Sequence, residues 1–357
     1  MKIFNVSRLA FARKRRQLTK KELAEIAGIS HVTLTRIDKG ITTNPDDETI
    51  ASIAAALQYP VDFFFHEDIE ELNKKEVSFR SLKAMTAKQS EAALASGALG
   101  QIFNDWVSSK FNLPEPDVPE LRNEDPASAA ASIRRHWGIG FRPIKNLIKL
   151  LEAKGIRVFT LSEGKTVDAF SFWRDGTPYI FLNTLKSAER SRFDAAHELG
   201  HLLMHVHGYP EGREVEKEAD LFASHFLIPR EDLISNIHSI NSLSQLKEYK
   251  ARWGVSVTAL ARTAKDANLL SEWHYRELCR QMSAAGYRTT EPNSMPRESS
   301  TLWRKVLEEL WKEKFTKEKI AKHLDLPLDE VNSLLQGILG EPLNDSAAMS
   351  KPSLRLV

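Results

Sequence analysis

Residues 192–229 read RFDAAHELGHLLMHVHGYPEGREVEKEADLFASHFLIP, and apolar residues recur through them every three or four positions. This spacing predicts one helix over residues 188–207 and a second over residues 213–227. The core-facing residues of the first helix are Ala195, Ala196, Leu199, Leu202, Leu203 and Val206. His197 and His201 are one turn apart on a different face, so their two imidazoles can reach a single metal ion.

Three carboxylates complete a candidate metal site around this histidine pair. Glu198 lies about 100° around the helix from His197, near enough to reach a water molecule held by the metal. A zinc ion needs a third protein ligand, and the second helix offers Glu216 and Asp220, both off its apolar line. One of these carboxylates can bind zinc while the other accepts the remaining ring N–H of a ligand histidine. We assign Glu216 to the metal and Asp220 to the histidine.

The same segment resembles the ImmA/IrrE family of metallopeptidases. The resemblance is carried by HELGH at 197–201, EKEAD at 216–220 and FLIP at 226–229, and it extends less sharply over residues 130–265. It implies a thermolysin-like (zincin) core with a bound Zn²⁺ ion. Members of the family cleave a partner repressor, often a helix-turn-helix protein, so the resemblance also implies a protein substrate.

The residues that the resemblance assigns agree with those found from spacing. It implies that zinc is bound by His197, His201 and Glu216 and that Glu198 is the general base. Zinc lowers the pKa of a coordinated water toward about 7 and polarises a carbonyl, and Glu198 can pass the water proton to the leaving amine. The predicted reaction is peptide hydrolysis. Two other interpretations stay open: a metal site that does not hydrolyse, and a pair of exposed histidines beside a glutamate.

Substrate binding and oxyanion stabilisation are less closely defined by the sequence. Residues 179–183 are expected to form a sheet edge to which an extended substrate could add. His205 could be a rival metal ligand or a transition-state donor, and His225 or Tyr179 could also contribute. A packing or surface role is the alternative for each of these three side chains.

The amino-terminal residues 7–65 contain short helices with clear boundaries. Thr19 and Glu22 form a capping box, Gly28 ends that helix, Ser30 caps the next, and Gly40 stands where a left-handed residue is needed. Residues 8–64 resemble the Xre-type helix-turn-helix domain of phage-repressor-like proteins. The matching motifs are Leu18-Thr19, Leu23-Ala24, Gly28-Ile29-Ser30 and Ile37-Asp38-Lys39-Gly40.

This resemblance implies binding to a double-stranded DNA operator. It places the DNA-reading helix at residues 30–39, with its amino-terminal end in the major groove. The side chains expected at base edges are His31, Val32, Thr33 and Arg36, whereas those expected at phosphates are Lys20, Lys21 and Ser30. Two-fold operators would imply a homodimer. An Xre fold used for protein contact is the alternative interpretation.

Charge is distributed unevenly along the chain. Residues 1–39 contain ten Lys and Arg against three Asp and Glu, a net charge of 10 − 3 = +7, whereas the whole chain carries +2. The remainder is therefore at 2 − 7 = −5. A basic end on a mildly acidic body is typical of one domain that meets phosphates, although a solvated helix face gives the same pattern.

Strand signals appear in the middle of the chain. Residues 155–161 favour a strand, and residues 169–173 and 179–182 flank Asp175-Gly176, a hairpin signal. We predict a mainly α protein with a small antiparallel sheet: an all-α helix-turn-helix domain, an α+β zincin domain and a carboxy-terminal helical region. The predicted boundaries are 1–67 for the helix-turn-helix domain, 68–140 for a helical connecting region, 141–268 for the peptidase-like domain, 269–345 for the carboxy-terminal helices and 346–357 for a tail.

A second helix-turn-helix cadence occurs within residues 316–335. Its second helix begins with Asp329 and Glu330, which suit the helix dipole but repel phosphate. We therefore favour a protein-contact or dimerisation role over a second DNA reader. Trp303 and Trp311 are expected in the core, and the Pro- and Ser-containing residues 291–300 are expected to be a linker.

Composition limits the setting in which the protein works. With 357 residues, 42% hydrophobic residues and one cysteine, the chain can fold into several domains but cannot form an intrachain disulfide. The sequence contains no signal-peptide pattern and no long uncharged apolar run. These features favour a cytoplasmic location without membrane insertion.

Together these patterns predict a DNA-binding transcriptional regulator with a zinc metalloendopeptidase domain. It would cleave a protein partner, or itself, to switch gene expression in stress, prophage or toxin-antitoxin-like regulation. The alternative is a non-proteolytic DNA-binding regulator in which the metal domain is a ligand sensor or a structural module.

Overall fold

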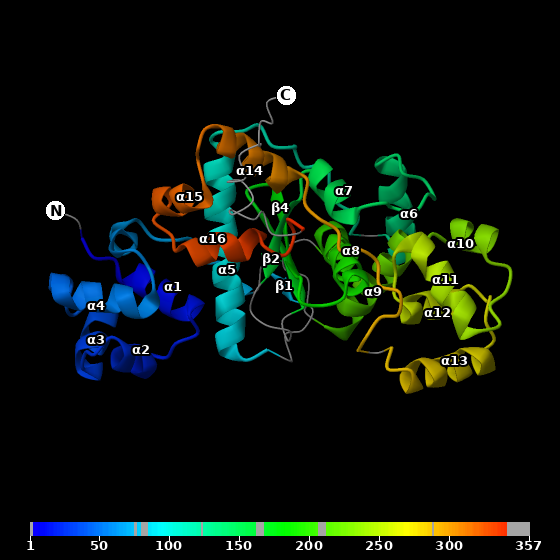
Figure 1. Cartoon of the computed structure of the whole chain (residues 1–357), viewed down its shortest axis with the longest axis horizontal. Coiled ribbons are helices and arrows are strands. Elements are labelled where there is room, and N and C mark those ends of the chain that lie inside the picture. The colour runs from blue at the N-terminus through cyan, green and yellow to red at the C-terminus, as the bar shows by residue number, and fades with distance from the viewer. Residues whose placement is uncertain are drawn as a thin grey trace, which may run out of the picture.

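A computed structural model describes residues 3–74, 77–79, 85–122, 124–161, 168–205, 212–287 and 289–340. The fold is mainly helical with one small sheet, as the sequence predicts. In Figure 1 the amino-terminal helices lie at one end of an elongated molecule, the sheet lies near the middle, and the helices from α10 (Arg230–Asn236) to α13 (Glu272–Ala284) lie at the other end. The predicted tail, residues 346–357, lies outside the described residues.

The amino-terminal module has the helix boundaries that its capping residues predict. Thr19 and Glu22 form a complete capping box, and the side chain of Ser30 accepts a hydrogen bond from the backbone N–H of Thr33. Gly28 and Gly40 both have left-handed backbone angles, with φ of 66° and 68°. The elements are α1 (Val6–Arg15), α2 (Lys20–Ile26), α3 (His31–Asp38), α4 (Asp47–Leu57) and a 3-10 helix (Val61–Phe65).

The sheet has the strand order β1-β3-β4-β2. Asp175 and Gly176 both have positive φ and form the predicted turn of an antiparallel hairpin between β3 and β4. Strand β2 pairs with β4 in parallel, so the sheet is mixed and the prediction of an antiparallel sheet holds for the hairpin but not for β2. The strands are β1 (Ser78–Phe79), β2 (Arg157–Leu161), β3 (Ala169–Arg174) and β4 (Thr177–Asn183).

Two long helices cover the two faces of the sheet. On one face, α5 (Ala87–Ser108) packs closely, because a side chain at Gly100 would clash with the ring of Phe181. On the other face, α8 (Ala188–Met204) contacts β3 and β4, and Ser171 of β3 points toward Glu198 of this helix. The sheet thereby fixes the position of the helix that carries both histidines.

The predicted helix over residues 213–227 is α9 (Arg213–Leu227), and it packs against α8. Its buried apolar line is Ala219, Phe222, Ala223 and Phe226. Helix α6 (Pro126–His136) packs on α9 and α5 packs on the sheet, so helices from residues 68–140 contact the elements that position the histidines and Glu216. The remaining helices here are α7 (Leu147–Ala153), α10 (Arg230–Asn236), α11 (Leu243–Trp253), α12 (Val257–Asp266) and α13 (Glu272–Ala284).

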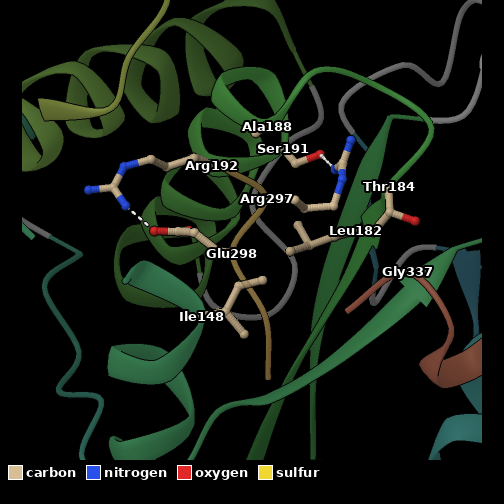
Figure 2. Close-up of a pocket in the computed structure, with 9 residues that line it drawn as sticks. All are labelled: Ile148, Leu182, Thr184, Ala188, Ser191, Arg192, Arg297, Glu298 and Gly337. Carbon is tan, nitrogen blue, oxygen red and sulfur yellow. Dashed lines mark hydrogen bonds and ion pairs between the residues drawn. The ribbon is translucent and has the colours of Figure 1, made fainter. Parts of the chain in front are cut away.

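Residues 291–300, predicted to be a linker, connect α13 to the carboxy-terminal helices but are packed against the rest of the protein. Glu298 is buried, forms an ion pair with Arg192 of α8 and accepts a hydrogen bond of 2.8 Å from the backbone N–H of Leu147. Ser300 is also fully buried. Figure 2 shows Arg192 and Glu298 beside a small cavity. A chain segment without regular structure is therefore held against the start of α8 by buried polar contacts.

The carboxy-terminal helices are α14 (Leu302–Lys312), α15 (Lys317–His323) and α16 (Leu328–Leu335). Trp303 is fully buried as predicted, whereas the prediction of a core position for Trp311 is wrong, because its side chain is 49% exposed. Helix α16 lies against β2 and α5. No helix in the described part of the chain is both long and apolar enough to cross a membrane.

Candidate metal centre and DNA-binding module

Helix α8 brings the predicted site residues to the interior of the protein. Ser187 caps its amino-terminal end, and its buried apolar residues match the predicted core face. The helix ends at Met204, and Val206 of the predicted core face lies outside the described residues. His197 and Glu198 are completely buried, and His201 is only 3% exposed. Buried imidazoles and carboxylates are costly unless they have polar partners, so their surroundings decide what this site can do.

The two histidines and Glu216 converge on one point. The Nε2 atoms of His197 and His201 are 3.0 Å apart. The carboxylate of Glu216 lies 3.4 Å from His197 Nε2 and 3.5 Å from His201 Nε2, one oxygen toward each ring. One ligand atom from each residue lies within 4.8 Å of the others, a grouping that could hold a metal ion. Two imidazoles and one carboxylate form the donor set of many catalytic zinc sites.

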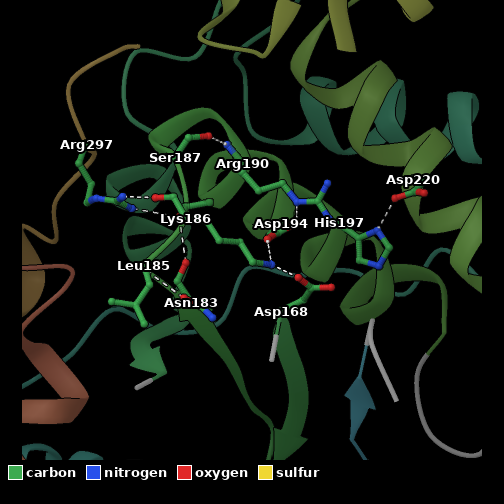
Figure 3. A network of polar contacts seen from close by, with 11 residues as sticks. Asp168, Asn183, Leu185, Lys186, Ser187, Arg190, Asp194, His197, Asp220 and Arg297 are labelled. Carbon is green, nitrogen blue, oxygen red and sulfur yellow. Dashed lines mark hydrogen bonds and ion pairs between the residues drawn. The ribbon is translucent and has the colours of Figure 1, made fainter. Parts of the chain in front are cut away.

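Asp220 lies where the sequence predicts, on the far side of the His197 ring. Its Oδ1 atom is 2.9 Å from His197 Nδ1, and Figure 3 shows the ring pointing toward this carboxylate. A carboxylate at Nδ1 places the proton on that nitrogen and leaves Nε2 free to bind a metal. The two carboxylates thus occupy different positions, with Asp220 at His197 Nδ1 and Glu216 beside the Nε2 atoms of both histidines.

Among the described residues, only one of the two carboxylate oxygens of Glu198 has a hydrogen-bond partner. Its Oε2 atom accepts a hydrogen bond of 2.7 Å from the hydroxyl of Ser171, on β3. Its Oε1 atom is buried and has no hydrogen-bond partner among the described residues. An unpaired buried oxygen on a glutamate between two histidines is what a proton acceptor beside a metal site requires. Ser171 was not predicted, because nothing in the local sequence relates it to Glu198.

Burial and hydrogen bonding shift the pKa values of the two glutamates in opposite directions. Burial raises the pKa of Glu198 to about 7, although the charge of His197 opposes the shift. Burial also acts on Glu216, but hydrogen bonds from His197 and His201 outweigh it and lower its pKa to about 2. Burial lowers the pKa of His201 to about 4. Near neutral pH, Glu216 is thus an anion, His201 is a neutral imidazole and Glu198 can exchange a proton.

The three residues considered as further ligands or oxyanion donors lie in different surroundings. Tyr179 is buried on the sheet and receives a hydrogen bond of 2.9 Å from Asn104, on the α5 side. His225 lies on α9, where burial lowers its pKa. Neither belongs to the grouping of His197, His201 and Glu216. His205 does contact that grouping, because its Nδ1 atom is 3.0 Å from His201 Nδ1.

The prediction that residues 179–183 form a free sheet edge is wrong. They belong to β4, which lies between β3 and β2. The strand beside Glu198 is β3, and its outer side pairs with β1 at Phe170 and Ser171. The error arose because a hairpin signal identifies two neighbouring strands but not the strands that pair outside them.

The amino-terminal module exposes the helix expected to read DNA. His31, Val32 and Arg36 are exposed on α3, whereas Leu34 and Ile37 are buried. Thr33 is half-buried, and its hydroxyl lies 2.8 Å from that of Ser30. Lys21 is exposed, while Lys20 forms an ion pair with Asp38 of the same module. The predicted base-contacting surface is therefore accessible, and Lys20 has an internal carboxylate partner.

Comparisons with known sequence families agree with both resemblances. Residues 151–265 match a peptidase family described as the IrrE N-terminal-like domain. Residues 9–64 match the helix-turn-helix family. The chain therefore joins an Xre-type helix-turn-helix domain to an ImmA/IrrE-like, metallopeptidase-family domain. No curated protein matches the chain.

Proposed function

We propose that the protein is a zinc metalloendopeptidase and a DNA-binding transcriptional regulator in one chain. The observation that carries the peptidase proposal is the buried Oε1 atom of Glu198, which has no hydrogen-bond partner in the described part of the chain and lies beside the converging donors of His197, His201 and Glu216. These donors fit Zn²⁺, which favours four ligands from nitrogen and oxygen and leaves one position for water or substrate in catalytic sites.

The roles of the residues follow from their contacts. His197, His201 and Glu216 would hold the ion, and Asp220 would keep the proton of His197 on Nδ1. Zinc would supply a polarised carbonyl and a coordinated water with a pKa near about 7. Glu198 would accept the proton of the attacking water at Oε1 and return it to the leaving amine, while Ser171 holds Oε2.

The regulatory half of the proposal rests on the exposed face of α3. Arg36 would bind guanine in the major groove, Val32 would contact a thymine methyl group, and His31 and Thr33 would lie beside them. Lys21, Lys20 and Ser30 would contact phosphates, with Lys20 giving up Asp38 on binding. The peptidase would cleave a protein partner, such as a helix-turn-helix repressor, or the chain itself, and a homodimer would fit a two-fold operator.

The test is a comparison of the parent protein with Glu198→Gln. We expect expression of the parent to produce new protein amino termini, detected by mass spectrometry, that are absent with the variant. Glu198→Gln should keep its zinc, because Glu198 is not a ligand. Glu214→Gln, at an exposed position of α9, is the matched control and should cleave as the parent does. Identical amino termini from the parent and Glu198→Gln would contradict the peptidase proposal.

A non-proteolytic sensor is the second candidate function. The complete burial of His197 and Glu198 favours it, because a polypeptide must reach both the metal and the general base. In that case the parent would bind zinc and DNA but would produce no new amino termini. The same comparison therefore distinguishes the two functions.

A further inference from the structure

We propose that His205 and Glu218 form a hydrogen-bonded chain that fixes the proton of His201 and thereby positions it as a metal ligand. The inference rests on the proposed metal centre and adds two positioning residues to it. It concerns metal binding and not the hydrolysis step.

Two contacts define the chain. His201 Nδ1 lies 3.0 Å from His205 Nδ1, and His205 Nε2 lies 2.9 Å from Glu218 Oε2. Both imidazoles are almost fully buried, with side-chain exposures of 2% for His201 and 4% for His205. Glu218 is partly exposed, so the chain runs from the metal centre to the protein surface.

Metal binding by His201 determines which nitrogen of each imidazole carries the proton. If His201 binds the ion through Nε2, its Nδ1 must carry the proton and donate it to a partner. His205 then accepts with Nδ1 and must carry its own proton on Nε2. That proton is donated to Glu218, an acceptor when ionised. One arrangement of protons therefore satisfies both hydrogen bonds: His201 donates to His205, and His205 donates to Glu218.

The geometry does not favour His205 as a direct ligand. Its Nδ1 atom faces the side of the His201 ring that points away from Glu216, and its Nε2 atom faces Glu218. The backbone N–H of His205 donates to the carbonyl of His201 at the end of α8, which holds the ring one turn beyond the ligand. His205 is thus placed behind His201, as Asp220 is placed behind His197.

Helix α9 supplies the carboxylates that contact His197 and His205. Glu216 and Asp220 are four residues apart and share one flank of its apolar line. Glu218 lies two residues from each, about 200° around the helix, and reaches His205 from the other flank. The two histidine ligands are therefore supported from both sides of α9, one directly and the other through a second imidazole. In the sequence, the only local sign of this contact is that His205 follows His201 by four residues, one helical turn.

The first test measures zinc affinity by competition with a chelator. We expect Glu218→Ala and His205→Ala to weaken zinc binding by about 10–100-fold, the usual effect of losing such a partner, while one zinc per chain still binds at saturation. His205→Asn should lose less than His205→Ala, because its amide oxygen can accept from His201 Nδ1. Glu214→Ala, on the exposed face of α9, should bind zinc as the parent does.

A double variant separates a chain from two independent effects. Because Glu218 acts through His205, His205→Ala/Glu218→Ala should bind zinc no more weakly than His205→Ala alone. If the losses of zinc affinity in the two single variants add in the double variant, the proposed hydrogen-bonded chain is contradicted. The melting temperatures of the metal-free variants provide a second readout, since a purely structural role would lower them in proportion to the loss of affinity.

Nitrogen-15 NMR of the zinc-loaded parent tests the protons directly. We expect His201 to be protonated at Nδ1 and His205 at Nε2. A metal-bound nitrogen on His205, or unchanged zinc affinity in both Glu218→Ala and His205→Ala, would overturn the inference. A folded parent that binds no zinc would contradict the metal centre as well. Zinc binding with the expected variant effects but without proteolysis would contradict only the proposed peptidase activity.

Discussion

The chain contains two helix pairs with the same cadence, α2–α3 and α15–α16, and the structure places them in opposite environments. Helix α3 has no acidic residue in its first turn and exposes Val32 and Arg36. Helix α16 has Asp329 and Glu330 in its first turn and packs against β2 and α5. The first pair presents its second helix to solvent, whereas the second pair uses it to hold the protein together.

The two acidic residues of α16 form ion pairs with the basic carboxy-terminal end of α1. Glu330 is 1% exposed, with its Oε2 atom 2.8 Å from Arg15 Nε and its Oε1 atom 3.2 Å from the hydroxyl of Tyr59. Asp329 pairs with Arg16 at 2.6 Å. Part of the positive charge of residues 1–39 therefore serves contacts within the chain. A helix-turn-helix cadence alone does not define a DNA reader, because the charge at the start of the second helix also determines its partner.

The largest effect is expected from Glu330→Ala. This change leaves Arg15 nearly buried without its carboxylate and removes the partner of Tyr59, which should lower the free energy of unfolding by about 3–5 kcal/mol. Chemical denaturation of the full chain measures the loss. Asp329→Ala is the matched control in the same turn and should cost about 0–1 kcal/mol, because Asp329 is 58% exposed. Equal losses from both variants would contradict the buried contact.

A smaller effect is expected from Arg36→Ala on operator binding. Loss of a bidentate contact to guanine should weaken binding to the operator by about 1–3 kcal/mol and leave binding to random DNA nearly unchanged. Lys322→Ala, at an exposed position of α15, is the control in the other pair and should alter neither affinity. Fluorescence anisotropy with both DNA molecules measures the difference. An equal loss of operator affinity in the two variants would contradict the claim that only the α2–α3 pair reads DNA.

The smallest effect is expected from Lys21→Ala. A phosphate contact contributes without regard to sequence, so the variant should bind operator and random DNA less tightly by a similar factor. The slope of log affinity against log salt should become shallower by about 1. A titration at several salt concentrations measures this slope. An unchanged slope would show that Lys21, although exposed, does not contact phosphate.

The sequence predicts features that depend on local spacing. The caps at Thr19 and Ser30, the turn at Asp175-Gly176 and the positions of Glu216 and Asp220 are all set by residues within one or two turns. Their backbone geometry, or the side-chain contacts that spacing implies, recurs wherever the same pattern occurs. Such features therefore need no knowledge of the tertiary structure.

Features that join distant parts of the chain were not predicted. The hydrogen bond from Ser171 to Glu198 needs β3 to lie against α8, and the contact of Arg15 with Glu330 spans 315 residues. The parallel pairing of β2 depends on the chain crossing from one side of β4 to the other after β2. Apolar periodicity indicates that each element has a buried face but not which element covers it.

The central claim, a zinc centre on α8 and α9, is tested most directly by the zinc content of the purified protein. We predict about one zinc per chain in the parent and in the Glu214→Ala control, and a clear loss in His201→Ala and Glu216→Ala. All four proteins should be folded, as judged by circular dichroism. A folded parent that contains no zinc after zinc is supplied, or full zinc content in both ligand variants, would contradict the account.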